Sequence, residues 1–243
     1  MKNKFNILYF AAIIATVLLL TACNNDEDKD SYGISKVTSL PKLTLTNEGE
    51  ITVIGKGSSF VEPGYTALAG TVDITNAVLV KGSVNTSVAG MYTIEYVAVN
   101  PEGFTTTKMR NVFVADLTDP LTEDISGEYT SNVIRTTATA SAKRGPYTLN
   151  LEKLVTGLYY VDDFLGGWYW IGSNYGTSYA YDGIILVKSS GEVVLQWSNT
   201  DTGWGDGAVL NSPVYIAATK TFTWGAQMGD ASQYMFNVTL VKK

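Results

Sequence analysis

The sequence predicts an all-β protein with two domains, the second an eight-stranded antiparallel β-barrel or sandwich. The composition is rich in Gly, Thr, Ser, Val and Tyr, and long Leu, Ala, Glu or Lys stretches are absent. Short segments of alternating apolar and polar residues recur at a spacing of about 10–14 residues, with turn sequences between them. All five tryptophans and ten of the fifteen tyrosines follow residue 120, so the composition changes between the two halves.

The N-terminal segment has the pattern of an export signal. Lys2 and Lys4 precede an apolar run over residues 7–20, and the small residues before Cys23 form a cleavage site. This run of about 14 residues is shorter than the ~20 residues that a membrane-spanning helix needs. We therefore predict a signal peptide over residues 1–22.

The sequence around the single cysteine is more specific than the apolar run. Residues 20–23, Leu-Thr-Ala-Cys, resemble a bacterial lipobox, in which the cysteine is diacylated and becomes the first residue of the mature protein. The acidic run over residues 24–30 resembles the signal that brings Bacteroidetes lipoproteins to the outer face of the outer membrane. These resemblances imply a lipid anchor at Cys23 and a cell-surface location. Residues 23–39 are polar and show no periodicity, which predicts a flexible acidic tether.

Residues 40–115 are expected to form the first domain, because alternating segments and turn sequences begin at Pro41. The strongest turn signal is the Asn-Pro-Glu-Gly sequence over residues 100–103. The predicted strands are 43–45, 51–53, 78–80, 92–99 and 104–114. Their number and spacing indicate a small β-sandwich.

The same domain resembles the bacterial Ig-like modules that are common on surface proteins. The matching segments are Pro41-x-Leu43-x-Leu45, Gly57-x-x-Phe60-Val-Glu62-Pro63-Gly64-Tyr65-x-Ala67, Gly90-x-Tyr92-x-Ile94-x-Tyr96 and Asn100-Pro-Glu-Gly103. The resemblance implies an Ig-like β-sandwich that serves as a spacer or an interaction platform.

Residues 116–124 are acidic and contain Thr and Pro, which predicts a linker before a C-terminal β-domain over residues 125–243. The eight predicted strands are 127–135, 145–154, 158–162, 179–187, 192–197, 214–217, 221–226 and 234–241. Eight successive strands without helical insertions favour a barrel or a sandwich. The Ser126-Gly127-x-Tyr129 sequence is similar to a short lipocalin motif, which would make the barrel lipocalin-like.

The composition excludes several classes of function. The chain has no histidine and one cysteine, so neither a Ser-His-Asp triad nor a common zinc site can form. The net charge of −6, without clustered Lys and Arg, argues against nucleic-acid binding. No pair of Asp residues is singled out by spacing for glycoside hydrolysis, so we expect no enzyme, no cofactor and no metal site.

The densest constellation of aromatic residues lies between Gly157 and Tyr181. If residues 168–170 form a strand, Trp168 and Trp170 share one face and Tyr169 takes the other. Exposed rings next to Asp and Asn suit sugars, whose C–H faces stack on the rings while the polar side chains bond the hydroxyl groups. The candidate ligand-binding residues are Trp168, Trp170, Tyr175, Tyr179, Trp204, Asp162, Asp163 and Asp206. The alternative is that these aromatic residues are core.

The mature chain also resembles an uncharacterised Bacteroidetes surface lipoprotein family that joins an Ig-like module to an aromatic-rich β-domain. The resemblance is carried by Ser126-Gly127-x-Tyr129 with Arg135, the run 157–169, Tyr175-Gly176 and Trp204-Gly205-Asp206. It implies a surface protein beside outer-membrane glycan-uptake systems.

We therefore expect a non-catalytic, lipid-anchored surface protein of the outer membrane that binds glycan through exposed aromatic residues. Its expected partners are the membrane, a glycan and outer-membrane uptake proteins. The alternatives are a structural or adhesive surface protein without a small ligand, and a lipocalin-like binder of an apolar small molecule.

Overall fold

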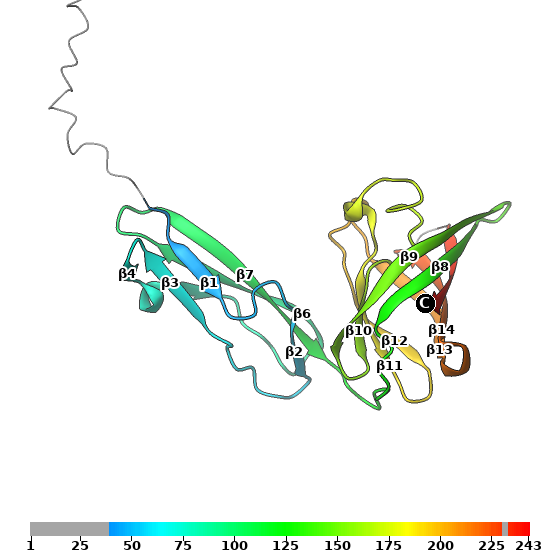
Figure 1. The fold of residues 1–243 in the computed structure, drawn as a ribbon, viewed down its shortest axis with the longest axis horizontal. Helices are drawn as coiled ribbons and strands as arrows, with labels where there is room; N and C mark the ends of the chain where they lie inside the picture. The colour runs from blue at the N-terminus through cyan, green and yellow to red at the C-terminus, as the bar shows by residue number, and fades with distance from the viewer. Residues whose placement is uncertain (1–38, 230–232) are drawn as a thin grey trace, which may run out of the picture. The chain divides into compact units, whose positions relative to one another are not determined.

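The computed structural model describes residues 39–229 and 233–243, with strands β1–β7 in the N-terminal part and β8–β15 in the C-terminal part (Figure 1). The predicted lipid-attachment residue Cys23, the signal peptide and nearly all of the tether lie outside the described residues. The described elements are strands and three single-turn 3-10 helices, η1 (Thr75–Ala77), η2 (Thr177–Tyr179) and η3 (Ala217–Thr219). Within the described ranges, no helix has the length and apolar character needed to span a membrane. The all-β prediction is confirmed.

The N-terminal part is a sandwich of two sheets. Its strands are β1 (Lys42–Leu45), β2 (Thr52–Gly55), β3 (Tyr65–Ala69), β4 (Val72–Asp73), β5 (Leu79–Lys81), β6 (Gly90–Val99) and β7 (Thr105–Ala115). One sheet has the order β1-β3-β4 and the other β2-β7-β6-β5, with β2 parallel to β7. The alternating residues Leu43, Leu45, Ile94, Tyr96 and Val112 point between the sheets and are buried, as the period-2 pattern requires.

The Ig-like sequence motif stabilises this sandwich through an ion pair inside it. Arg110 of β7 has a fully enclosed side chain, and its Nη2 lies 3.1 Å from Oε1 of Glu62. The guanidinium also donates to the carbonyl oxygens of Thr46, at 2.9 Å, and Gly64, at 3.1 Å. The Tyr96 hydroxyl donates to the same Glu62 carboxylate. The motif residues Glu62, Gly64 and Tyr96 therefore satisfy a buried charge.

Two strands of the sandwich were missed by sequence analysis. Strand β3 follows directly on the Pro63-Gly64 turn, and β4 has only two residues, both exposed. Strand β3 has a single fully buried residue, Ala67, which is too weak an alternation to identify from the sequence.

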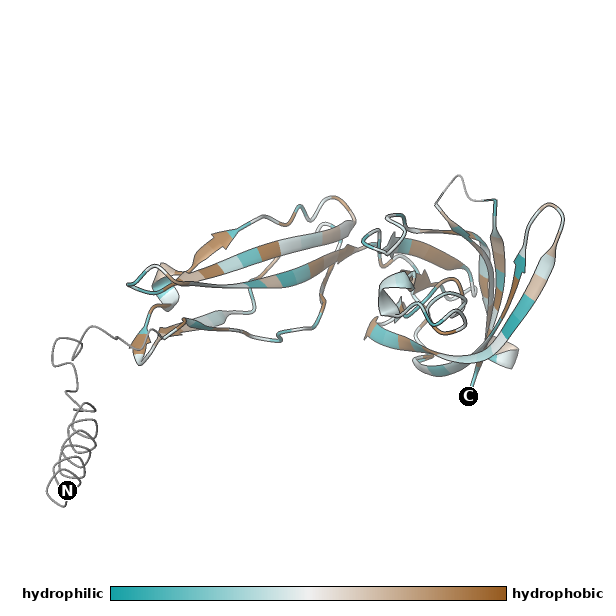
Figure 2. Cartoon of the chain, turned by 90° about the horizontal axis from the view of Figure 1, so that it is seen from above, coloured by the Kyte–Doolittle hydropathy of each residue, from teal (hydrophilic) through white to brown (hydrophobic). Residues whose placement is uncertain are grey.

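The C-terminal part is an eight-stranded antiparallel meander. Its strands are β8 (Gly127–Thr136), β9 (Ser141–Val155), β10 (Leu158–Val161), β11 (Gly183–Val187), β12 (Val193–Ser198), β13 (Ala208–Ile216), β14 (Thr221–Met228) and β15 (Met235–Lys242). All eight predicted strands are present, although β9 and β13 begin earlier and β11 later than expected. The hydropathy of the strand residues alternates along the chain, with apolar residues in the interior (Figure 2).

The sheet curls into a nearly closed barrel. The first and last strands, β8 and β15, pair over eight residues, which gives the order β12-β11-β10-β9-β8-β15-β14-β13. The two outer strands, β12 and β13, meet in one isolated bridge between Glu192 and Val214. The barrel alternative of the prediction is therefore confirmed.

The β10–β11 loop (residues 162–182) lies across one open end of this barrel and fills it (Figure 2). The indole Nε1 of Trp224 on β14 donates to the carbonyl oxygen of Phe164 at 2.8 Å. Ser131 of β8 donates to the carbonyl oxygen of Gly166 at 2.9 Å. A Cβ on Gly166 would lie 3.1 Å from Val133, so the missing side chain allows the loop to pack inside the barrel wall.

The expectation of a strand over residues 168–170 is wrong. Residues 164–172 form consecutive turns, so Trp168, Tyr169 and Trp170 do not alternate between two faces. The physical reason is the pair Gly166 and Gly167, both with positive φ (71° and 85°), which the extended conformation of a strand excludes.

Candidate functional site

Trp168 is a core residue at the filled end of the barrel. Its side chain is 1% exposed and contacts the edge of Phe236, with ring centroids 5.8 Å apart. The guanidinium carbons of Arg144 and Arg135 lie 4.4 Å and 4.8 Å from its ring centroid. Trp170 is half-buried and packs against the same core. Trp168 therefore offers no free face on which a ligand could stack.

Four other aromatic residues gather where the β10–β11 loop meets the 199–207 loop, and we call Tyr169, Tyr175, Tyr179 and Trp204 the aromatic cluster. Tyr169 stacks on Tyr175 at a centroid distance of 5.9 Å and an interplanar angle of 18°. The ring centroid of Trp204 lies 5.4 Å from that of Tyr169 and 5.3 Å from that of Tyr179. Each ring contacts at least two others, so the cluster is a continuous apolar surface.

The cluster is open to solvent on the side of Tyr175 and Trp204. These two side chains are 52% and 46% exposed, whereas Tyr169 beneath them is 9% exposed. The Tyr175 and Trp204 centroids are 6.4 Å apart and their planes are inclined by 49°, so they form an adjacent, exposed pair of rings. Two adjacent aromatic rings held open to water on a buried base are typical of a binding surface.

Asp206 joins the 199–207 loop to the barrel interior. Its carboxylate accepts the hydroxyl proton of the buried Tyr181, and its carbonyl oxygen accepts a hydrogen bond from Thr202 at 2.9 Å. Burial raises the pKa of Tyr181, and its hydrogen bond to the Asp206 carboxylate adds to the effect. Asp206 therefore sets the position of the loop that carries Trp204.

Asp163 has a structural role inside the β10–β11 loop. The side chain is fully buried, and its two oxygens accept the backbone N–H groups of Leu165 and Gly167 at 2.9 Å and of Tyr181 at 3.1 Å. Burial raises the pKa of this carboxyl group to about 6, against the opposing effect of the three N–H donors. The half-buried Asp162 accepts the backbone N–H of Asn150 at 2.8 Å. Neither carboxylate lies at the open surface.

The sequence-predicted residues therefore divide into two groups. Tyr175, Tyr179 and Trp204 come together at one exposed surface, and Asp206 supports it. Trp168, Trp170, Asp162 and Asp163 belong to the packing of the loop.

Sequence reasoning did not select Tyr169, the base of the cluster, or Arg144. Its place between Trp168 and Trp170 could have identified Tyr169 as a site residue. The strand expected over residues 168–170, however, would direct its side chain to the face opposite the two tryptophans. Across the described part of the chain, no group of three or more Cys, Asp or Glu residues is arranged to hold a metal ion.

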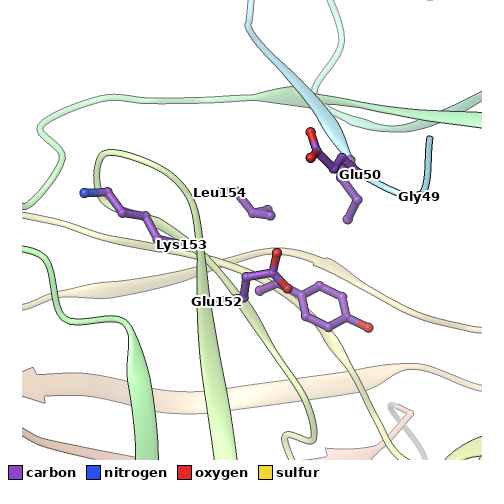
Figure 3. A pocket seen from close by; sticks show the side chains of 7 residues that line it. Gly49, Glu50, Glu152, Lys153 and Leu154 are labelled. Carbon is purple, nitrogen blue, oxygen red and sulfur yellow. The ribbon is translucent and has the colours of Figure 1, made fainter. Parts of the chain in front are cut away.

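A depression of about 520 Å³ has no residue of the aromatic cluster among its lining residues (Figure 3). Glu50, Glu152, Lys153, Leu154 and Tyr160 are among its lining residues. The Lys153 side chain points away from the two glutamates in Figure 3 and pairs with Asp124 at 3.1 Å. This depression has two carboxylates and no predicted site residue, so we do not assign the binding function to it.

Comparison with known proteins gives matches over both parts of the chain. The family model described as "Bacterial surface protein, Ig-like domain" matches residues 43–114, and a model of a C-terminal domain matches residues 118–242. The lipoprotein BT2262 from Bacteroides thetaiotaomicron, known from its crystal structure, is 33% identical in sequence. That match covers 83% of this chain and 99% of that chain, with a TM-score of 0.45. No curated protein matches the sequence.

Proposed function

The chain belongs to the same family as the Bacteroides lipoprotein BT2262, and from this premise we propose that it is a lipid-anchored surface protein that binds glycan. The proposed anchor is Cys23, and the proposed location is the outer face of the outer membrane. The protein has no catalytic role in this proposal and delivers glycan to an outer-membrane uptake system. The lipobox-like sequence and the acidic run that follows it support the anchor and the location.

The observation that supports glycan binding is the exposed pair of rings of Tyr175 and Trp204. Pyranose rings present apolar C–H faces that stack on the exposed faces of such aromatic side chains. The exposed Asn174 and Asp201 belong to the loops that carry these rings, and their side chains accept hydrogen bonds from sugar hydroxyl groups.

The packing of the barrel interior argues against a lipocalin-like pocket for an apolar ligand. Its interior is occupied by Tyr129, Tyr159, Phe164, Trp168, Tyr181, Phe222 and Phe236, all of which are fully buried. An apolar molecule would have to displace these side chains and the β10–β11 loop.

The proposal is tested on a glycan array. The array compares glycan binding by the wild-type mature chain and by its Trp204→Ala variant. Loss of one stacking ring should weaken binding about tenfold, because ring stacking contributes ~1–3 kcal/mol and ~1.4 kcal/mol corresponds to one decade. Tyr65→Phe is the control, since it keeps an aromatic ring on β3 of the Ig-like sandwich, outside the C-terminal barrel. Absence of glycan binding by the wild-type protein would leave the structural or adhesive alternative in its place.

A further inference from the structure

A second group of side chains at the filled end of the barrel brings two arginines onto one buried tryptophan ring. Arg135 of β8 and Arg144 of β9 both lie on Trp168, and we call these three residues the arginine site. Within the described residues, the indole Nε1–H of Trp168 has no hydrogen-bond partner although the side chain is 1% exposed. A buried N–H without an acceptor is rare and calls for an explanation.

Neither guanidinium group forms an ion pair with an acidic side chain of the described residues. Arg135 lies between the rings of Trp168 and Tyr234, at 4.8 Å and 5.0 Å, and makes neither an ion pair nor a hydrogen bond within the described part of the chain. Arg144 donates to the carbonyl oxygen of Trp168 at 3.0 Å and to the Ser173 hydroxyl at 2.7 Å, both of them neutral acceptors.

This arrangement is unusual in an acidic protein. The net charge is −6, with 23 Asp and Glu residues, and the third arginine of the chain, Arg110, pairs with Glu62. Arg135 and Arg144 lie on one ring, so their charges are closer than the Debye length of about 10 Å and repel each other. A bound anion would relieve this repulsion and supply an acceptor for Arg135.

We propose that the arginine site binds the carboxylate of an acidic saccharide. This inference rests on the proposed glycan-binding function and names the class of glycan. A guanidinium group offers a planar pair of N–H donors that matches the two oxygens of a carboxylate.

The carboxylate of the glycan lies at the arginine site and a neutral sugar ring lies on the exposed rings of the aromatic cluster. The two sites are connected through the β10–β11 loop, since Arg144 bonds Ser173 and Tyr175 follows two residues later. The 199–207 loop, which carries Trp204, also carries Asp201 and Asp206, which would repel a carboxylate. The charges therefore give the bound chain one orientation.

The experiment measures how tightly the mature chain binds matched oligosaccharides of galacturonate, glucuronate and mannuronate. Each oligosaccharide is tested as the free acid and as its neutral methyl ester. At least one free acid should bind, and its ester should bind at least about tenfold more weakly. Arg135→Gln should weaken binding of that acid about 10- to 100-fold, because it removes a charge-assisted hydrogen bond, and should leave ester binding unchanged.

Two controls separate binding from folding. Lys143→Gln removes a positive charge from an exposed position beside Arg144 and should change affinity less than about threefold. Arg135→Lys keeps the charge and should recover part of the lost affinity. If Arg135→Gln fails to fold, the wild-type protein still gives an answer, since raising the salt from about 0.05 to about 0.5 M should weaken binding of the acid and not of the ester.

The outcomes distinguish the two proposals. Equal affinity for acid and ester, or full acid affinity in a folded Arg135→Gln variant, would overturn the carboxylate site. Binding of neutral glycans alone, sensitive to Trp204→Ala, would also overturn it and leave the proposed function intact. If neither acidic nor neutral glycans bind, the proposed function fails, and this inference fails with it.

Discussion

The ring of Tyr179 occupies the space beside Gly203 that a side chain would otherwise fill. A Cβ on Gly203 would lie 2.6 Å from Cε1 and 2.8 Å from Cζ of that ring. The backbone N–H of Gly203 also donates to the carbonyl oxygen of Ser178 at 2.6 Å. This contact joins η2 to the 199–207 loop, so it determines how Trp204 meets the rest of the aromatic cluster.

Gly203→Ala should therefore disturb the aromatic cluster. The methyl group must push the Tyr179 ring aside, and such overpacking costs ~1–3 kcal/mol. We expect a change in near-ultraviolet circular dichroism and weaker glycan binding. Gly55→Ala is the control, because its Cβ would be 3.5 Å from Ser58, an ordinary contact. An unchanged aromatic signal in Gly203→Ala would contradict the packing described for Tyr179.

Trp168→Ala and Trp204→Ala should differ in their effect on stability. Truncation of a buried tryptophan lowers the free energy of unfolding by ~3–5 kcal/mol. Trp204 is 46% exposed, so its truncation should cost less than about 1 kcal/mol. Urea unfolding of both variants measures the difference. Similar losses in the two would mean that Trp204 is part of the core and not of a binding surface.

Asp163 should make the stability depend on pH between about 4 and about 6. Its pKa is about 6 in the folded protein and 3.8 as the reference for the unfolded chain. The folded state therefore binds more protons in this range, and the contribution of this group to stability is greatest below pH ~4 and is lost as the pH rises through about 6.

Asp163→Asn should remove this pH dependence and lower stability most at pH 4, where the wild-type carboxyl group contributes most. The amide nitrogen replaces one of the two oxygens that accept the N–H groups of Leu165, Gly167 and Tyr181. An unsatisfied buried donor costs ~1–3 kcal/mol. Unfolding measured at pH 4 and pH 7 in both proteins gives the comparison. The same pH slope in wild type and variant would show that another group titrates.

Glu62→Gln should destabilise the Ig-like sandwich. The change removes the negative charge opposite the enclosed Arg110 and weakens its charge-assisted hydrogen bonds, at a cost of ~1.5–3 kcal/mol. Glu95→Gln is a matched control, because its partner Lys81 has a side chain that is 58% exposed and such pairs contribute ~0–1 kcal/mol. Thermal unfolding should separate the two variants. Equal melting temperatures would mean that the buried Glu62–Arg110 pair contributes no more to stability than the exposed Glu95–Lys81 pair.

Cys23→Ser should release the protein from membranes. The proposed lipid is attached to the cysteine sulfur, and the hydroxyl of serine cannot replace it in the lipobox. Fractionation of cells that express both forms measures the effect, with the wild-type protein as the membrane-bound reference. Retention of the serine variant in the membrane fraction would rule out the lipid anchor.

The sequence by itself determined the strands, because their signal is local. Alternation such as Tyr147-Thr-Leu149-Asn-Leu151 identifies a strand with one buried face, and all eight strands of the barrel were located in this way. The absence of histidine and the single cysteine likewise exclude a Ser-His-Asp triad and the common zinc sites from the sequence alone.

Only the tertiary structure decided which aromatic residues are exposed. Trp168 and Trp204 both have glycine neighbours, yet one is 1% and the other 46% exposed. The difference arises because the turns at Gly166 and Gly167 fold Trp168 back into the barrel, against Phe236 of β15. The position of Arg135 and Arg144 on Trp168 also depends on tertiary structure. The register of the β8–β9 hairpin brings the two arginines together, and the β10–β11 loop, distant in the sequence, brings Trp168 to them. No local sequence pattern encodes such a long-range relationship.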